Sequence, residues 1–183
     1  MGRYDVLIKC AQIRKLIDEN KYTKALEALD ELDLAKVHSM SDLMLFAKVY
    51  EKADRFKEAK EIYYAVYEKK RSKRILYNLV LLVLRTGDLK EAKELYMEYE
   101  MAAGITLDTY ELRYRVARAS GEKRENLIEL LEDLRKEEFT EEWGYQLAKL
   151  YELDGNRKKC IEVCNDLVLW FGSGVIVDKA RKL

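Results

Sequence analysis

Hydrophobic positions recur every three or four residues along most of the chain, which is the spacing of one face of an α-helix. Three segments show the pattern most clearly. They carry Leu43-Phe46-Ala47-Tyr50, Leu76-Leu79-Val80-Val83 and Leu147-Ala148-Tyr151. Each set predicts a helix with a single buried face.

Short turn-like segments interrupt this pattern at a regular distance. Their central residues are Asn20, Asp54, Gly87, Gly121 and Gly155, so the spacings are 34, 33, 34 and 34 residues. Asn, Asp and Gly tolerate the left-handed backbone that ends one helix shortly before the next begins. In four units a small residue follows the turn, and a second residue comes four positions later: Ala25 and Leu29, Ala59 and Tyr63, Ala92 and Tyr96, Cys160 and Cys164. The sequence therefore predicts a repeated pair of helices.

These residues resemble those of a known family. Leu43-x2-Phe46-Ala47-x2-Tyr50, followed by Ala59-x3-Tyr63, resembles the signature of the tetratricopeptide repeat (TPR). Residues 86–96, TGDLKEAKELY, resemble the turn and second helix of such a repeat. The resemblance spans residues 6–171 and implies an all-α fold, a right-handed α-α superhelix (solenoid) of about five TPR-like helix pairs. A short C-terminal capping segment completes the expected fold.

The expected helix pairs and units follow from the repeat phase. The helices are predicted at 4–19 and 22–36, 41–53 and 56–70, 73–86 and 88–103, 107–119 and 123–137, and 140–154 and 156–171. Residues 1–183 are expected to form one repeat domain with units at 4–39, 40–72, 73–106, 107–139 and 140–172. Residues 173–183 form either a cap, because the apolar end of a solenoid needs a cover, or the start of a linker.

The chain departs from the family pattern in two ways. It contains no proline, so the proline that usually follows the second helix in the family is missing from every unit. In addition, two units have polar residues at core positions. Lys9 and Gln12 occupy expected core positions in the first unit, and Arg113 and Asn126 do so in the fourth. A shift of one residue in the fourth unit gives an apolar face of Leu127, Leu131 and Leu134, which predicts one extra residue in its turn.

Composition limits the kind of partner. The 183 residues include 34 Lys and Arg against 34 Asp and Glu, and 49% are hydrophobic. A balanced charge argues against a dedicated nucleic-acid or membrane-surface protein, and the apolar content argues against general disorder. RNA binding, as in helical-repeat families of similar period, is disfavoured for the same reason.

Cellular location is predicted from the segments that the chain lacks. The N-terminal residues have no apolar signal-peptide core, and the apolar run within 75–84 is too short for a bilayer. Three cysteines, an odd number, do not suit a secreted disulfide framework. We therefore expect a cytoplasmic protein with reduced thiols.

The TPR resemblance implies that the first helices line a concave surface that holds an extended peptide or a partner's helix. We therefore predict a non-catalytic protein–protein interaction scaffold. Basic residues recur at one equivalent position of that surface in four units, and they favour an acidic or phosphorylated peptide or a C-terminal carboxylate. The alternative is that these are ordinary solvated helix faces. The candidate groove residues are Arg14, Met44, Lys48, Arg74, Tyr77, Asn78, Arg115, Arg118, Tyr145, Gln146 and Lys149.

The family's carboxylate clamp for chaperone tails is not predicted. Asn78 matches its middle element. Met44 with Lys48, and Asp108 with Leu112, do not complete it.

No enzyme, metal site or cofactor is predicted. Cys160 and Cys164 share a helix face, but they occupy the small and large core positions of the repeat. His38 is the only histidine and has no acid–base partner in the sequence. The basic run within 68–74 has two interpretations, contact with phosphate groups or the end of a helix whose cations complement the helix dipole, and a single short run on a neutral chain favours the second.

A self-assembly or interdomain docking module is the alternative function, with a second copy or a neighbouring domain of a longer chain as the partner. Trp143, Trp170 and Phe171 are expected to pack the last unit and its cap. If Trp170 and Phe171 are instead exposed, they indicate a contact site.

Overall fold

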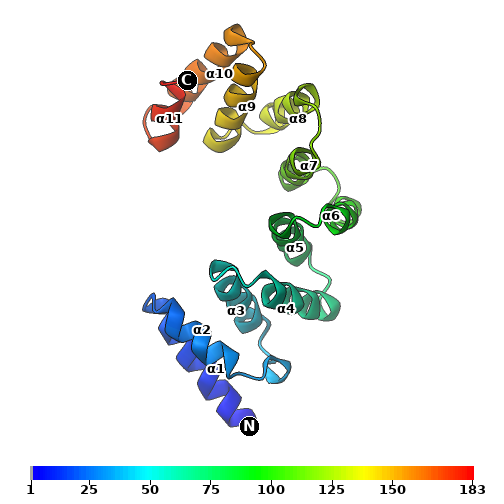
Figure 1. Ribbon diagram of the computed structural model, residues 1–183, viewed down its shortest axis with the longest axis vertical. Helices are drawn as coiled ribbons and strands as arrows, with labels where there is room; N and C mark the ends of the chain where they lie inside the picture. The colour runs from blue at the N-terminus through cyan, green and yellow to red at the C-terminus, as the bar shows by residue number, and fades with distance from the viewer. Residues whose placement is uncertain (1) are drawn as a thin grey trace. The chain divides into compact units, whose positions relative to one another are not determined.

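The computed structural model describes residues 2–183, which form eleven α-helices, one 3₁₀ helix and no strand (Figure 1). The chain divides into two compact units, residues 1–86 and 87–183. The first contains α1 (Arg3–Asp18), α2 (Tyr22–Asp30), the 3₁₀ helix η1 (Leu34–Lys36), α3 (Met40–Lys52), α4 (Phe56–Lys69) and α5 (Lys73–Thr86). The second contains α6 (Leu89–Ala103), α7 (Leu107–Ala119), α8 (Arg124–Glu137), α9 (Glu141–Leu153), α10 (Arg157–Phe171) and α11 (Val175–Ala180).

The five predicted turns lie between helices, as expected. Asn20 and Asp54 are the non-glycine residues with positive φ in the described chain, at 58° and 56°. Gly87, Gly121 and Gly155 adopt φ values of 83°, 72° and 74°. The left-handed backbone at every one of these positions explains why the repeat period can be read from Asn, Asp and Gly alone.

One predicted helix boundary is wrong. The repeat phase extends the second helix of the first unit to residue 36, but α2 ends at Asp30. Three acidic residues, Asp30, Glu31 and Asp33, lie at or just beyond its carboxyl end, where the helix dipole disfavours negative charge. The Asp33 side chain also accepts a hydrogen bond from the Ala35 backbone N–H at 3.2 Å, which favours the separate 3₁₀ turn.

The predicted core positions of the second and third repeats are confirmed within the first unit. Phe46 and Ala47 of α3 are fully buried, as are the central apolar residues of α5, Leu76, Leu79, Val80 and Val83. The first repeat buries a different stripe, formed by Val6, Cys10 and Ile13. The buried face of α1 therefore lies about one residue away from the register that the repeat pattern predicts. Lys9 is half-buried and reaches Glu31 at 3.1 Å, and Gln12 is exposed.

In the second unit the predicted one-residue shift is confirmed. Leu127, Leu131 and Leu134 of α8 are buried. Four residues, 120–123, separate α7 from α8, whereas three residues, 154–156, separate α9 from α10. Arg113 stays out of the core, because its guanidinium donates hydrogen bonds to Tyr96 and Glu100 of α6.

The C-terminal residues fold back on the last helix pair. α11 packs against α9 and α10 and buries Val177 and Ala180 (Figure 1). Phe171 is half-buried against Phe139, with ring centroids 5.7 Å apart, and Trp143 contacts Tyr114 edge-on at 5.6 Å. The expectation that Trp170 packs here is wrong, because 73% of its surface is exposed.

The three thiols are free and buried, which agrees with the core interpretation of Cys160 and Cys164. Burial, assisted by Cys160, raises the pKa of the Cys164 thiol to about 11. A thiol that stays protonated is a poor nucleophile and a poor metal ligand. Among residues 2–183, no helix combines the length and apolar character needed to cross a lipid bilayer.

Candidate peptide-binding pocket

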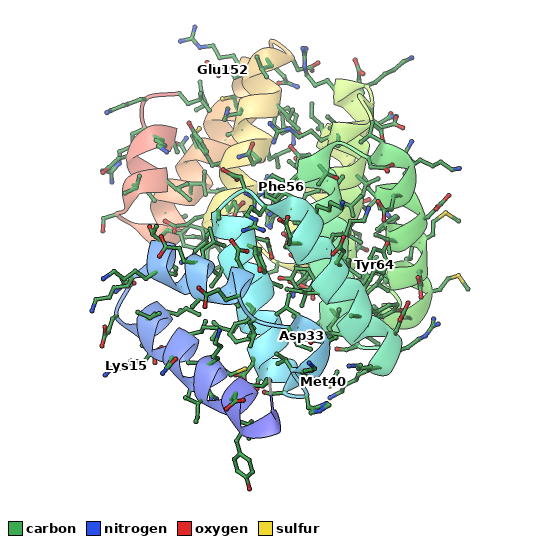
Figure 2. All side chains as sticks on the ribbon, turned by 60° about the horizontal axis from the view of Figure 1, so that its bottom comes forward. Lys15, Asp33, Met40, Phe56, Tyr64 and Glu152 are labelled. Atoms are coloured by element: carbon green, nitrogen blue, oxygen red, sulfur yellow. The ribbon has the colours of Figure 1, made fainter. Side chains whose placement is uncertain are left out.

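A cavity of about 250 Å³ lies on the surface of the first unit, bordered by α3, the end of α4 and the start of α5. We call it the basic pocket. Its apolar lining comes from Met40, Met44, Val66 and Ile75, and its polar lining from Ser41, Lys48, Lys70, Ser72, Arg74 and Asn78. Met40, the first residue of α3, is labelled in Figure 2.

Helical periodicity brings the polar residues together. Ser41, Met44 and Lys48 follow one another at intervals of three and four residues on α3, opposite the face that buries Phe46 and Ala47. Arg74 and Asn78 are four residues apart on α5. The sequence of each helix therefore fixes a core face and a pocket face at the same time.

The pocket carries uncompensated positive charge. Its lining contains Lys48, Lys70 and Arg74 but no Asp or Glu. Within the described part of the chain, no carboxylate forms an ion pair with any of the three. Other arginines of this unit are neutralised: Arg55 by Asp30 at 2.6 Å, and Arg85 by Glu51 at 3.5 Å.

An adjacent cavity of about 310 Å³ differs from the basic pocket in that its lining contains both acidic and basic residues. It shares Lys48 with the basic pocket, and Glu51, Lys52, Asp54 and Arg85 complete its lining. Arg85 also lies over the ring of Phe56, 4.6 Å from its centroid. Acidic and basic groups lie together there, whereas the lining of the basic pocket contains basic groups alone, and Lys48 is common to the two cavities.

The candidate groove residues of the first unit separate into two groups. The basic pocket brings together Met44, Lys48, Arg74 and Asn78. Arg14 has a different role, because it forms a salt bridge of 3.4 Å with Asp42, whose side chain is buried. Tyr77 is half-buried on α5 and is not among the residues that line this pocket.

The candidate groove residues of the second unit form ion pairs and ring contacts mainly with their own neighbours. Arg115 pairs with Glu111 at 2.8 Å and with Glu142 at 3.7 Å, and it lies 5.0 Å from the ring centroid of Trp143. Lys149 lies 5.8 Å from the ring centroid of Tyr145. The remaining two candidates are Arg118, which is exposed, and Gln146, which is half-buried. Positive charge is thus less available at Arg115 than at Lys48.

Sequence reasoning does not find the whole pocket. The sequence pattern assigns Lys70 to the basic end of a helix, and it does not single out Ser41 and Ser72. Lys70 and Ser72 belong to the junction between repeats, where the chain leaves α4 and enters α5. The basic run at 68–74 is the available signal, but it does not show which cations meet Lys48 of α3.

The pocket offers binding groups rather than a catalytic set. Ammonium, guanidinium, hydroxyl and amide donors surround an apolar wall, and no carboxylate or imidazole completes an acid–base pair in the lining. Within the described residues, no cluster of His, Cys, Asp and Glu could hold a metal ion. The arrangement suits an anionic group attached to an apolar stem.

A scan against protein-family models finds no match. A search of curated proteins also finds no match.

Solved structures do resemble the chain. A MamA protein from Desulfovibrio magneticus RS-1 superposes with a TM-score of 0.69 at 15% identity, covering 93% of this chain and 97% of that chain. A tetratricopeptide repeat protein from Parabacteroides merdae gives a TM-score of 0.73 at 11% identity, covering 90% of this chain and 64% of that chain. TPR-like repeats of a putative kinesin light chain from Podosopora anserina give 0.64 at 17% identity, covering 100% of both chains.

These similarities confirm the predicted fold class, an all-α array of helix pairs of the α-α superhelix class. Identities of 11 to 17% bear on the fold alone. The chain therefore has the fold of the tetratricopeptide repeats that its 34-residue period resembles.

Proposed function

We propose that the protein is a non-catalytic interaction scaffold that binds an acidic segment of a partner protein in the basic pocket. The observation that carries the proposal is the cluster of Lys48, Lys70 and Arg74 around one cavity without a carboxylate in its lining. Like charges gathered on a surface repel one another, so such a cluster costs stability unless a ligand compensates it.

The expected binding mode combines charge and apolar contact. An anionic side chain accepts hydrogen bonds from the pocket cations, and its neighbours lie against Met40, Met44 and Ile75. Methionine side chains adapt to different shapes, so the pocket accommodates varied flanking residues. A peptide that fills this one site is expected to bind with a dissociation constant on the order of 10 to 100 µM.

The proposal is tested with fluorescein-labelled degenerate peptides, acetylated and amidated at their ends, that carry either acidic or neutral residues. Fluorescence anisotropy is measured with the native protein and with a Lys48→Gln, Lys70→Gln, Arg74→Gln variant. We expect the native chain to prefer the acidic peptides and the variant to lose at least tenfold in affinity.

A matched control removes the same charge elsewhere. Lys90, Lys93 and Arg157 are exposed on the second unit, and no ion pair of theirs is found in the described chain. Their combined substitution by Gln changes net charge equally and should leave binding intact. Equal losses in both triple variants would show that only net charge matters and would refute a defined site.

Self-assembly is the second candidate function, favoured by exposed apolar residues on α1. Tyr4, Leu7 and Ile8 expose 81%, 55% and 57% of their surface on the side opposite the buried Val6, Cys10 and Ile13. We call this surface the α1 outer face. Apolar residues that gather on one exposed helix face are typical of contact sites, and a second copy of the chain is the partner that we assign to this face.

A further inference from the structure

We infer that the anion bound in the basic pocket is a phosphorylated side chain of the partner segment. This inference rests on the proposed function and specifies its ligand. It is drawn from the amount of positive charge, the number of hydrogen-bond donors and the apolar wall.

The charge of the pocket exceeds what one carboxylate neutralises. Lys48, Lys70 and Arg74 contribute three positive charges, and the lining contains no acidic residue. A carboxylate brings one negative charge, whereas a phosphoryl group brings about 1.5 to 2 at pH 7. Asp42, next to Ser41 in sequence, does not supply the difference, because it is buried and paired with Arg14.

The donors are also more numerous than a carboxylate requires. Two ammonium groups, the planar guanidinium fork of Arg74 and the amide of Asn78 line the same cavity as the hydroxyls of Ser41 and Ser72. A carboxylate presents two oxygens and a phosphoryl group presents three terminal oxygens. The phosphoryl group therefore satisfies more of these donors, and the guanidinium can bind two of its oxygens at once.

One hydroxyl of the pocket lining, that of Ser41, is held in place by a neighbouring side chain. Ser39 Oγ accepts a hydrogen bond from the Asp42 backbone N–H at 3.2 Å, and it lies 2.9 Å from Ser41 Oγ. When the Ser39 hydroxyl donates to Ser41, the Ser41 hydroxyl hydrogen is left to donate to a ligand. A relay of this kind strengthens each successive hydrogen bond.

The apolar wall is adaptable rather than selective. Met40 and Met44 have several rotatable bonds and fit many neighbouring shapes. The pocket should therefore distinguish the modification strongly and the surrounding sequence weakly.

The experiment compares three degenerate peptide libraries that differ only in a fixed central residue, which is phosphoserine, serine or glutamate. All peptides are acetylated and amidated, so that no terminal carboxylate competes. A fourth library has central serine and a free C-terminal carboxylate. Affinities are measured by anisotropy at one ionic strength, because salt screens such contacts.

We expect the phosphoserine library to bind at least tenfold more tightly than the glutamate library, and the serine library to bind weakly. The Lys48→Gln, Lys70→Gln, Arg74→Gln variant should lose this preference, and the Lys90→Gln, Lys93→Gln, Arg157→Gln control should keep it. Ser41→Ala should weaken phosphoserine binding more than glutamate binding.

The outcomes separate the inference from the proposed function. Equal affinity for phosphoserine and glutamate, lost in the pocket variant, would overturn the phosphate inference and leave the acidic-segment proposal standing. Preference for the free C-terminal carboxylate would overturn the phosphate inference and would also replace the anionic side chain of the proposed function by a chain end. No binding of any library, or binding that survives the pocket variant, would overturn both.

Discussion

Gly144 shows how closely one residue can be constrained by its surroundings. In the second and third repeats the equivalent positions hold Leu43 and Leu76, whereas the fifth repeat has glycine in the buried face of α9. A Cβ atom at Gly144 would lie 2.8 Å from Phe139 Cε2 and 2.9 Å from Leu167 Cδ2. The ring of Phe139 and the side chain of Leu167 thus fill the space that a larger residue takes elsewhere.

Gly144→Ala should therefore destabilise the protein by about 1 to 3 kcal/mol through overpacking, despite the better helix propensity of alanine. Urea denaturation followed by circular dichroism measures the change. Asn165→Ala, on the exposed face of α10, is the matched control and should change stability by less than about 0.5 kcal/mol. A Gly144→Ala variant as stable as the native chain would show that Phe139 moves aside without cost.

Tyr50 joins α3 to the preceding helix through its hydroxyl. It donates a hydrogen bond of 3.3 Å to Asp30, which Arg55 also binds at 2.6 Å. The Arg55 guanidinium lies 4.8 Å from the centroid of the Tyr50 ring. Burial, together with the charge of Asp30, raises the pKa of Tyr50 to about 12.

A raised tyrosine pKa means that the folded state holds its proton more tightly than the unfolded state. The corresponding stability is present below the ordinary pKa of 10 and is lost as the pH rises from 10 to about 12. At pH 8, Tyr50→Phe should cost about 1 kcal/mol for the lost hydrogen bond. The difference between native protein and variant should shrink when urea titrations are repeated at pH 11. A difference that does not change with pH would contradict the raised pKa.

At the scale of elements, a polar network links α6 to α7. The Arg113 guanidinium donates to Tyr96 at 3.0 Å and to Glu100, and Tyr96 donates to Glu100 at 2.8 Å. The hydrogen bond from Arg113 lowers the pKa of Glu100. The network explains why arginine occupies a position where the repeat pattern expects a core residue.

The coupling between Arg113 and Glu100 can be measured with a double-mutant cycle of Arg113→Ala and Glu100→Ala. We expect a coupling free energy of about 1 kcal/mol at pH 7, reduced from a buried value because both side chains are partly hydrated. Since the pKa of Glu100 is lowered, the coupling should be full above its ordinary value of 4.5 and should disappear as the pH falls below it. The pair Arg124 and Asp154, 3.7 Å apart near the surface, serves as the control and should couple more weakly.

The sequence predicts a structural feature well where neighbouring residues along the chain determine it. Helix ends are set by turn residues such as Asp54 and Gly87, so the predicted positions agree with the structure within one residue in nearly every case. α2 differs because the acidic residues at its end act against a regular apolar pattern. The register of α1 differs because Lys9 and Gln12 break the stripe, and burial then selects Val6, Cys10 and Ile13.

The basic pocket needs information that periodicity lacks. Lys48 and Arg74 can be assigned to exposed helix faces from the sequence, but their common cavity depends on how α3, α4 and α5 pack. Periodicity also does not show which cations have a carboxylate partner. Arg14 and Lys48 occupy equivalent repeat positions, yet only Arg14 has a buried carboxylate within 3.4 Å.

For the whole molecule, a net charge of zero conceals an uneven distribution. The 34 acidic and 34 basic residues exclude a strong general attraction to polyanions. They do not exclude a local anion site, because cations such as Arg55 and Arg85 are paired with carboxylates while the lining of the basic pocket contains no carboxylate. The balance therefore favours recognition of one group on a partner over broad electrostatic binding.

The α1 outer face makes a prediction about assembly. Tyr4, Leu7 and Ile8 leave on the order of 400 Å² of largely apolar surface exposed on each copy. Doubled, this is about 800 Å², less than a stable specific interface buries, so we expect a weak contact that forms only at high concentration. Tyr4, Ile8, Ala11 and Lys15 form a stripe at intervals of four and three residues, and Figure 2 shows Lys15 on the outside of α1. Antiparallel pairing of two such stripes sets Ile8 against Ala11 and Tyr4 beside Lys15 of the second copy. Parallel pairing would instead oppose Lys15 to itself.

Because antiparallel pairing closes a two-fold contact, the weight-average mass should rise with concentration and level off at twice the 21.6 kDa of one chain. Sedimentation equilibrium from about 1 to 500 µM measures it, and a contact of this size should dissociate at about 10 to 100 µM. Leu7→Glu with Ile8→Glu should keep the protein monomeric, because each copy would bring two carboxylates into an apolar contact that removes their hydration. Leu169→Glu with Trp170→Glu removes exposed apolar residues from the second unit and should leave the dimer intact. Loss of association in that control alone would move the contact to α10, and growth beyond two copies would exclude a closed pair.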